Sequence, residues 1–140
     1  MTRYAEGTTV EVEKSRAEMV GTLGRYHVRK FGWEFLDDGD VLFFEIEGKA
    51  YRMKVPRPDP ESFSYNPRID NKILVDREWK RRWRALAMLL KMKLEFSDSG
   101  DSTIENELMP YLVLRDGSTL GEAILGNKVP LLPATVGAPA

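Results

Sequence analysis

The stretch FGWEFLDDGDVLFFEIEGKAYRMKVPRP, residues 31–58, decides the fold that the sequence predicts. Asp37, Asp38 and Gly39 are typical of a turn, and Gly48 with its neighbours is typical of a second, tighter turn. Around these turns apolar and polar residues alternate, which places the apolar side chains of each strand on one face. The stretch therefore predicts a three-stranded antiparallel meander.

The two faces of this meander differ in character. On one face Glu45 and Glu47 lie near Arg52 and Lys54, and opposite charges on neighbouring strands attract one another. The other face is apolar and carries Leu42, Phe44, Ile46, Tyr51, Met53 and Val55. We expect a helix to cover the apolar face.

The segment before the meander predicts a short strand and a helix. TTVEVEK, residues 8–14, alternates apolar and polar residues and is rich in β-branched types, which indicates a half-buried edge strand. SRAE, residues 15–18, has the spacing of a capping box with Ser15 as the N-cap. A helix is expected over residues 16–29, where one face carries Met19, Val20, Leu23 and Tyr26.

The segment after the meander predicts a loop and further helices. Residues 56–70 hold four prolines and few apolar residues, so an extended loop is expected. A long helix follows, with Asp76 as its expected N-cap. SDSGDS ends this helix, STIE begins a short one, and YLVLRDGSTLGEAI predicts a strand, a turn and a short final helix.

The expected fold class is therefore α+β, with the element order β-α-β-β-β-α-α-β-α. A small antiparallel sheet, made of the three-stranded meander plus the edge strand, would be covered by helices. A chain of 140 residues that is 42% hydrophobic suits one domain with its own core. We expect this domain over residues 1–126 and a loosely ordered tail over residues 127–140.

Composition narrows the classes of function. The chain has no cysteine, which excludes disulfides and thiolate zinc sites, and its single histidine, His27, excludes a multi-histidine metal site. No segment approaches roughly 18 consecutive apolar residues, and no apolar run follows the first basic residue. We expect a cytoplasmic protein with no membrane partner and no cofactor.

The charge is unevenly distributed along the chain. The formal net charge is −1, yet residues 77–93 hold seven basic residues against one acidic residue, Glu78. At 100° per residue, the apolar face of this helix carries Trp79, Trp83, Leu86, Leu90 and Leu94, widened by Ala85, Leu89, Met92 and Phe96. The opposite face carries five basic side chains, which we call the basic stripe: Arg77, Lys80, Arg81, Arg84 and Lys91.

Two explanations of the basic stripe stay open. Any half-buried helix needs a charged outer face, and lysine and arginine are good helix formers. The stripe is densest in the first turns, however, where the positive end of the helix dipole favours acids. We therefore expect an anion beside it: the protein's own carboxylates, those of a partner, or phosphates.

A helix, three antiparallel strands and a second helix with a basic first turn resemble the layout of the double-stranded RNA-binding domain. The resemblance covers residues 15–95 and implies that this basic turn contacts phosphates. The long loop before the second helix departs from that family, and so does WRALAMLLK, which stands where the family has small residues. The resemblance is therefore one of architecture.

The enzyme classes that we considered are disfavoured. Glu47-Gly48-Lys49 after Asp40 resembles the Mg²⁺-binding signature of restriction-endonuclease-like nucleases. Asp40 and Glu47 would, however, lie at opposite ends of one strand, about 23 Å apart at ~3.3 Å per residue. SDSGDSTIENE lacks the spacing of a calcium loop, and no nucleophile accompanies His27. We expect a protein that is not an enzyme and that holds no metal.

Four segments together resemble a set of small proteins encoded by bacteriophages and prophages. They are EVEKSRAEM, PRPDP, RRWRALAMLLKMKLE and YLVLRDGSTLGE. The resemblance implies no catalytic or binding residue. It favours a role in phage DNA metabolism or in the manipulation of a host protein.

Two functions follow as alternatives. The first is a non-enzymatic nucleic-acid-binding protein of phage replication or recombination, whose basic stripe contacts phosphates and whose Arg52 and Lys54 extend that surface. The second is a protein-binding module, such as a phage inhibitor of a host protein or an oligomeric accessory subunit, in which the stripe meets an acidic surface. The acidity of the whole chain favours the second, because dedicated nucleic-acid binders are usually basic.

Overall fold

The computed structural model describes residues 3–134, with residues 3–10 described for their helical backbone alone. Its elements are α1 (Arg3–Arg25), β1 (Lys30–Leu36), β2 (Gly39–Ile46), β3 (Lys49–Pro56), α2 (Asn71–Asp98), α3 (Ile104–Leu108) and α4 (Leu120–Leu125). Two short 3₁₀ turns, η1 (Pro60–Ser62) and η2 (Met109–Tyr111), lie between them. The fold class is α+β, as predicted.

The predicted meander is confirmed. Its strands form an antiparallel sheet in the order β1-β2-β3, with Leu42 of β2 opposite Trp33 of β1 and Met53 of β3. Both predicted turns are present, and each contains a glycine of positive φ, Gly39 and Gly48. At Gly39 a Cβ would collide with the Val55 carbonyl oxygen, so the first turn requires glycine on steric grounds as well.

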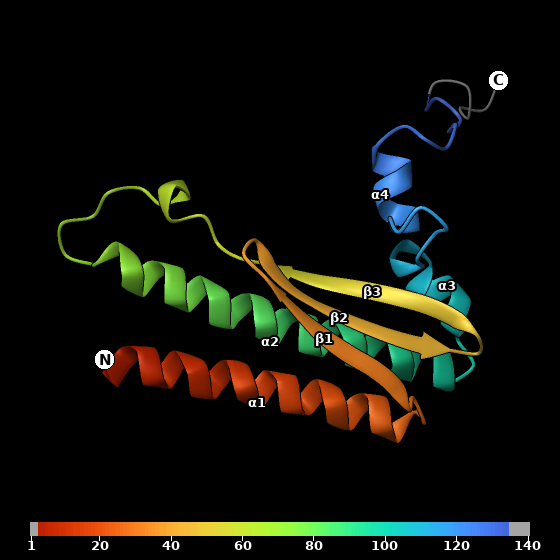
Figure 1. Cartoon of the computed structure of the whole chain (residues 1–140), viewed down its shortest axis with the longest axis horizontal. Helices are drawn as coiled ribbons and strands as arrows, with labels where there is room; N and C mark the ends of the chain where they lie inside the picture. Colours follow the sequence, from red (N-terminus) through yellow and green to blue (C-terminus); the bar gives the residue numbers. More distant parts are fainter. Residues whose placement is uncertain (1–2, 135–140) are drawn as a thin grey trace.

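Two long helices, α1 and α2, run parallel to each other behind the sheet (Figure 1). The three strands return the chain to the end where α1 begins, and α2 therefore runs in the same direction as α1. Trp83, Leu90 and Leu94 of α2 are fully buried against the apolar face of the sheet and against α1. The predicted inward face of the long helix is thus confirmed.

The predicted edge strand at residues 8–14 is wrong. These residues belong to α1, and Ser15, the expected N-cap, is a buried residue in the middle of that helix. Val12, Ser15, Met19 and Leu23 recur at intervals of three or four and form the buried side of α1. Packing along this helical face outweighs the β-propensity of a short alternating run.

The first helix also ends earlier than expected, at Arg25 instead of residue 29. His27 has a φ of 63°. The backbone N–H of Val28 donates to the Leu23 carbonyl at 2.9 Å, and that of His27 donates to the Gly24 carbonyl at 3.1 Å. This pair of hydrogen bonds is a Schellman motif, which ends a helix and turns the chain towards β1.

Asp70, and not Asp76, is the N-cap of α2. Its carboxylate accepts a hydrogen bond from the Lys72 backbone N–H at 2.9 Å, so α2 begins at Asn71. Asp76 lies inside the helix. Both aspartates have the right chemistry for a cap, and half-buried apolar residues at positions 73–75 place the boundary at the earlier one.

The region after α2 is only partly as predicted. The strand expected near residue 112 is reduced to two isolated bridges, Tyr51 with Leu112 and Val113 with Thr119. Thr103 caps α3 one residue later than expected. The short final helix is confirmed as α4, which begins with a capping box formed by Thr119 and Glu122.

The segment predicted as a tail, residues 127–140, follows α4 in the chain. Residues 127–134 contain no helix or strand, and residues 135–140 lie outside the described part of the chain. Among the helices of residues 3–134, none has the length and apolar character needed to cross a bilayer.

We predict that Leu90→Ala lowers the free energy of unfolding by about 2–5 kcal/mol, because it opens a cavity where α2 meets the sheet. Met88→Ala is the control, because Met88 is exposed on the same helix, and its effect should stay within about 0.5 kcal/mol. Urea denaturation of both variants measures the difference. Equal effects would contradict the packing of α2 described above.

Candidate nucleic-acid interface

The basic stripe lies along the outer side of α2, because the register that buries Trp83 and Leu90 turns the opposite side of the helix to solvent. The side chains of Arg81 and Arg84 are 65% and 62% exposed. Lys80 differs from the others, since its side chain is largely covered. Four of the five predicted side chains are therefore accessible along one helix.

Among the described residues, three carboxylates lie beside the stripe, and each of them is close to two cations. Glu11 of α1 reaches across to α2, with one oxygen 3.6 Å from Lys80 Nζ and the other 3.6 Å from Arg84 Nη2. Glu78, within α2, pairs with Arg81 and also lies 3.9 Å from Arg82 Nε. Carboxylates of the protein itself are therefore one of the anions expected beside the basic stripe.

A third shared carboxylate lies near the end of α2. Glu95 Oε1 is 4.0 Å from Lys91 Nζ and 3.9 Å from Arg25 Nη1 of α1. At Glu78 and at Glu95, one negative charge therefore faces two positive charges. These contacts hold the side chains of the stripe in place, but they leave part of its positive charge unbalanced.

The excess of positive charge is greatest at the beginning of α2. The helix Asn71–Asp98 contains eight basic and four acidic residues. Arg77 is exposed, as are Lys72 at the start of α2 and Arg68 in the loop before it. None of these three side chains forms an ion pair with the described side chains of residues 11–134, so their charges are available to an external anion. Lys72 and Arg68 were missed by sequence reasoning because the helix was expected to begin six residues later.

Arg52 and Lys54 do not join the stripe. They lie on the face of the sheet opposite to α2, because side chains alternate along β3 and Met53 points into the core. Arg52 donates to the Gly117 carbonyl at 3.0 Å and pairs with Glu122, and Lys54 pairs with Asp38 at 2.7 Å. These contacts fasten the turn before α4 and the turn between β1 and β2.

Glu122 is tied into the structure from several sides. The backbone N–H and hydroxyl of Thr119, and then the Arg52 guanidinium, donate to this carboxylate and hold its pKa below its usual value. Arg52 is therefore engaged in fixing α4. The structure gives it a role different from the predicted contact with phosphates.

A cluster of charges in the core was not foreseen. Asp40 is 4% exposed, and its oxygens lie 3.8 Å from Arg16 Nη2 and 3.7 Å from Arg57 Nη2. Burial raises the pKa of Asp40, and the charges of Arg57 and Arg16 oppose that rise. Asp40 follows the turn directly, at the beginning of the strand, and was assigned no place in the core by sequence reasoning. Its alternation with Leu42 and Phe44 was the signal that it faces inward.

The arginines of this cluster also stack on aromatic rings. The Arg16 guanidinium lies 4.8 Å from the ring centres of Phe35 and Trp83, and that of Arg57 lies 4.7 Å from the centre of Trp79. The cluster joins α1, the first turn of the sheet and α2. Trp83 is fully buried and Trp79 is partly buried against the core, so both act as core anchors.

An apolar strip lies beside the basic stripe on α2. It consists of Leu89, Met92 and Phe96, all of which are exposed, with Met92 at 64%. The sequence placed these residues at the margin of the apolar face. The core uses only the centre of that face, so the strip is left on the surface.

The nuclease-like arrangement is not formed. Asp40 lies at the start of β2 and Glu47 in the turn after its end. In the part of the chain that the structure describes, no group of three or more His, Cys, Asp or Glu side chains is placed to hold a metal ion. No protein-family model, curated protein or solved structure matches the chain.

We predict that Glu11→Gln makes the protein bind a polyanion more tightly, because Lys80 and Arg84 lose the carboxylate that they share. Retention on immobilised heparin measures this, and the variant should elute at higher salt than the parent protein. Glu13→Gln is the matched control, with the same change of charge at an exposed position of α1. Equal retention of the two variants would show that net charge alone matters and not the position of Glu11.

Proposed function

We propose that this protein binds nucleic acid through contacts between its basic stripe and phosphates and that it catalyses no reaction. Its setting would be the cytoplasm, in the replication or recombination of phage DNA. The observation that carries the proposal is the exposed row of cations on α2. Glu78 and Glu95 each face two cations, so their negative charge does not balance the positive charge around them. Arg77 has no ion pair with any described residue.

The dimensions of the stripe suit a nucleic-acid backbone. Arg77 and Lys91 are separated by fourteen residues of α2, which is about 21 Å at 1.5 Å per residue. This length matches about six steps of a duplex at ~3.4 Å per step. One rigid helix can therefore meet several phosphates at once.

The intramolecular ion pairs do not prevent such binding. Arg81, Arg84 and Lys91 form theirs at the surface, where an ion pair contributes only about 0–1 kcal/mol. A phosphate can replace the carboxylate at small cost, and the release of counterions from the nucleic acid favours the exchange. The carboxylates would also keep the stripe soluble and in place before a ligand arrives.

We predict that fluorescently labelled DNA or RNA binds at about 50 mM salt and that the affinity falls steeply with salt, with a log–log slope of roughly 0.7–0.9 per phosphate contacted. The double variant Arg81→Gln/Arg84→Gln should weaken binding and lower this slope by about 1–2, as measured by fluorescence anisotropy. Arg115→Gln is the control, since Arg115 is exposed and lies outside α2. The absence of binding to single- and double-stranded DNA and RNA would refute the proposed function.

A second candidate function is supported by the apolar strip. Three large apolar side chains beside exposed arginines have the composition of a protein interface, in which Met, aromatic residues and Arg are enriched. The partner would be an acidic protein surface or a second copy of this chain. This candidate accounts for Leu89, Met92 and Phe96, which phosphate binding leaves unused.

We predict that, if the apolar strip is an interface between copies, light scattering will show a molar mass that rises with protein concentration. Met92→Glu should then restore the mass of the monomer, because a charge in the strip cannot be buried. Leu125→Glu is the matched control at another exposed apolar position, in α4. A constant monomer mass for the parent protein excludes self-association through the strip.

A further inference from the structure

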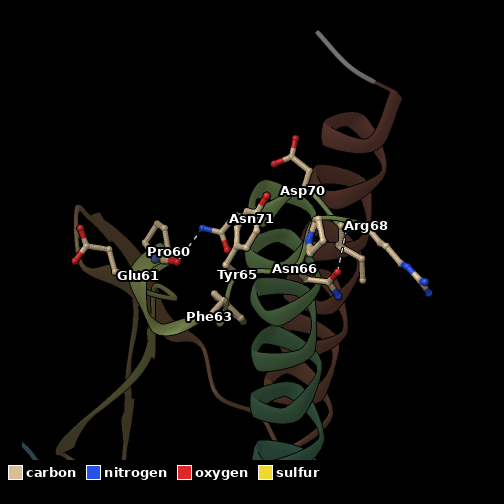
Figure 2. A pocket seen from close by; sticks show the side chains of 10 residues that line it. Pro60, Glu61, Phe63, Tyr65, Asn66, Arg68, Asp70 and Asn71 are labelled. Carbon is tan, nitrogen blue, oxygen red and sulfur yellow. Dashed lines mark hydrogen bonds between the residues drawn. The ribbon is translucent and has the colours of Figure 1, made fainter.

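The loop between β3 and α2 has a defined shape. Asp59 caps η1 by accepting from the Glu61 backbone N–H at 2.9 Å, and the Asn71 side-chain amide donates to the Pro60 carbonyl at 2.8 Å. The second bond ties the beginning of the loop to the beginning of α2. Between these two points lies a hollow of about 770 Å³, shown in Figure 2. A volume of this size is typical of a small-ligand site.

Tyr65 is the most distinctive residue of this hollow. Its side chain is 91% exposed, and it lies between the Pro60 side of the loop and the start of α2 (Figure 2). Phe63, two residues earlier, is half-buried and also lines the hollow. An aromatic ring that contributes no packing to the fold offers both of its faces to a planar ligand.

The residues around Tyr65 offer hydrogen-bonding groups that suit a base and a cation that suits a phosphate. The hollow is lined by carboxylates of Glu61 and Asp70 and by the amide of Asn66, groups that disfavour a phosphate but can hydrogen-bond to the edge of a base. Arg68 also lines the hollow, and Figure 2 shows its side chain extending away from the loop. Lys72 and Arg77 lie five residues apart on α2, about 140° from each other around the helix axis, and, like Arg68, form no ion pair with any described residue.

We propose that the hollow binds a base of a single-stranded nucleic acid, stacked on Tyr65, while the adjoining phosphates lie on Arg68, Lys72 and Arg77. This inference rests on the proposed function and specifies its ligand. The strand would run from the loop onto the basic stripe, because Arg77 belongs to both. A duplex keeps its bases stacked on each other and cannot present one to Tyr65, whereas a single strand can.

The test compares a single-stranded oligonucleotide with a blunt duplex of the same sequence, using anisotropy and the full chain. Tyr65→Ala should raise the Kd for the single strand roughly 5- to 160-fold, the range found for the loss of one base stack. It should leave the Kd for the duplex and the salt slope unchanged, because the ring carries no charge. Tyr65→Phe keeps the stacking face and should bind within about twofold of the parent protein.

A second variant addresses the cations. Arg68→Gln/Lys72→Gln should lower the salt slope for the single strand by about 1–2, whereas Tyr65→Ala should not. Because Tyr65 is exposed, its replacement should not change the thermal melting curve, which serves as the control for folding.

The possible results separate this inference from the proposed function. If the parent protein binds neither form of nucleic acid, both are refuted. If it binds nucleic acid but Tyr65→Ala weakens the single strand and the duplex equally, or weakens neither, the base site in the hollow is refuted and binding by the basic stripe stands. A preference of the parent protein for the duplex would also overturn the inference.

Discussion

The burial of Trp83 is the contact on which the arrangement of this protein depends. Its ring is fully buried, with its centre 5.4 Å from that of Trp33 on β1 and 6.0 Å from that of Trp79 on α2, and the Arg16 guanidinium of α1 covers it. One side chain thus brings both long helices and the sheet together. Because it sets which side of α2 faces the core, it also sets which side faces solvent. The accessibility of Arg77, Arg81 and Arg84 is a consequence of this packing.

The parallel direction of α1 and α2 explains the electrostatics of the surface. Three strands return the chain to its starting end, so the first turns of both helices lie together (Figure 1). In this register Glu11 of α1 lies beside the basic part of α2, and Arg25 lies beside Glu95. Because α2 begins at Asn71, the basic stripe starts beyond the first turn, where the helix dipole no longer disfavours it, and it is supported by Glu11 of α1 as well as by Glu78 and Glu95 of α2.

Three of the surface features described above lie on α2 or directly before it. The loop hollow with Tyr65 precedes α2, the basic stripe runs along that helix, and the apolar strip lies beside the stripe in the second half of the helix. Exposed rings and methionines reduce solubility, so a helix that served only to cover the sheet would gain from polar residues at these positions. Their presence on the outer side of α2 supports a ligand or partner there. On the opposite face of the sheet, the basic side chains Lys30, Arg52 and Lys54 are each paired with a carboxylate of the protein itself.

The sequence by itself determined the meander, the inward face of the long helix and the row of cations opposite to it, because each depends on local periodicity and turn chemistry. The tertiary structure decided what local patterns leave open. Residues 8–14 are helical because Val12 can continue the face that packs on α2, and a run of seven residues carries too little periodicity to show this. Alternation along a strand shows which side chains share a face of the sheet, but the helices decide which face becomes the core. For this reason only the structure shows that Asp40 is buried and that Arg52 faces away from α2. Likewise, Glu11 is about 70 residues before Lys80 and Arg84 in the sequence, and nothing in the sequence indicates that they meet. Only the packing of α1 on α2 shows that Glu11 pairs with both of them.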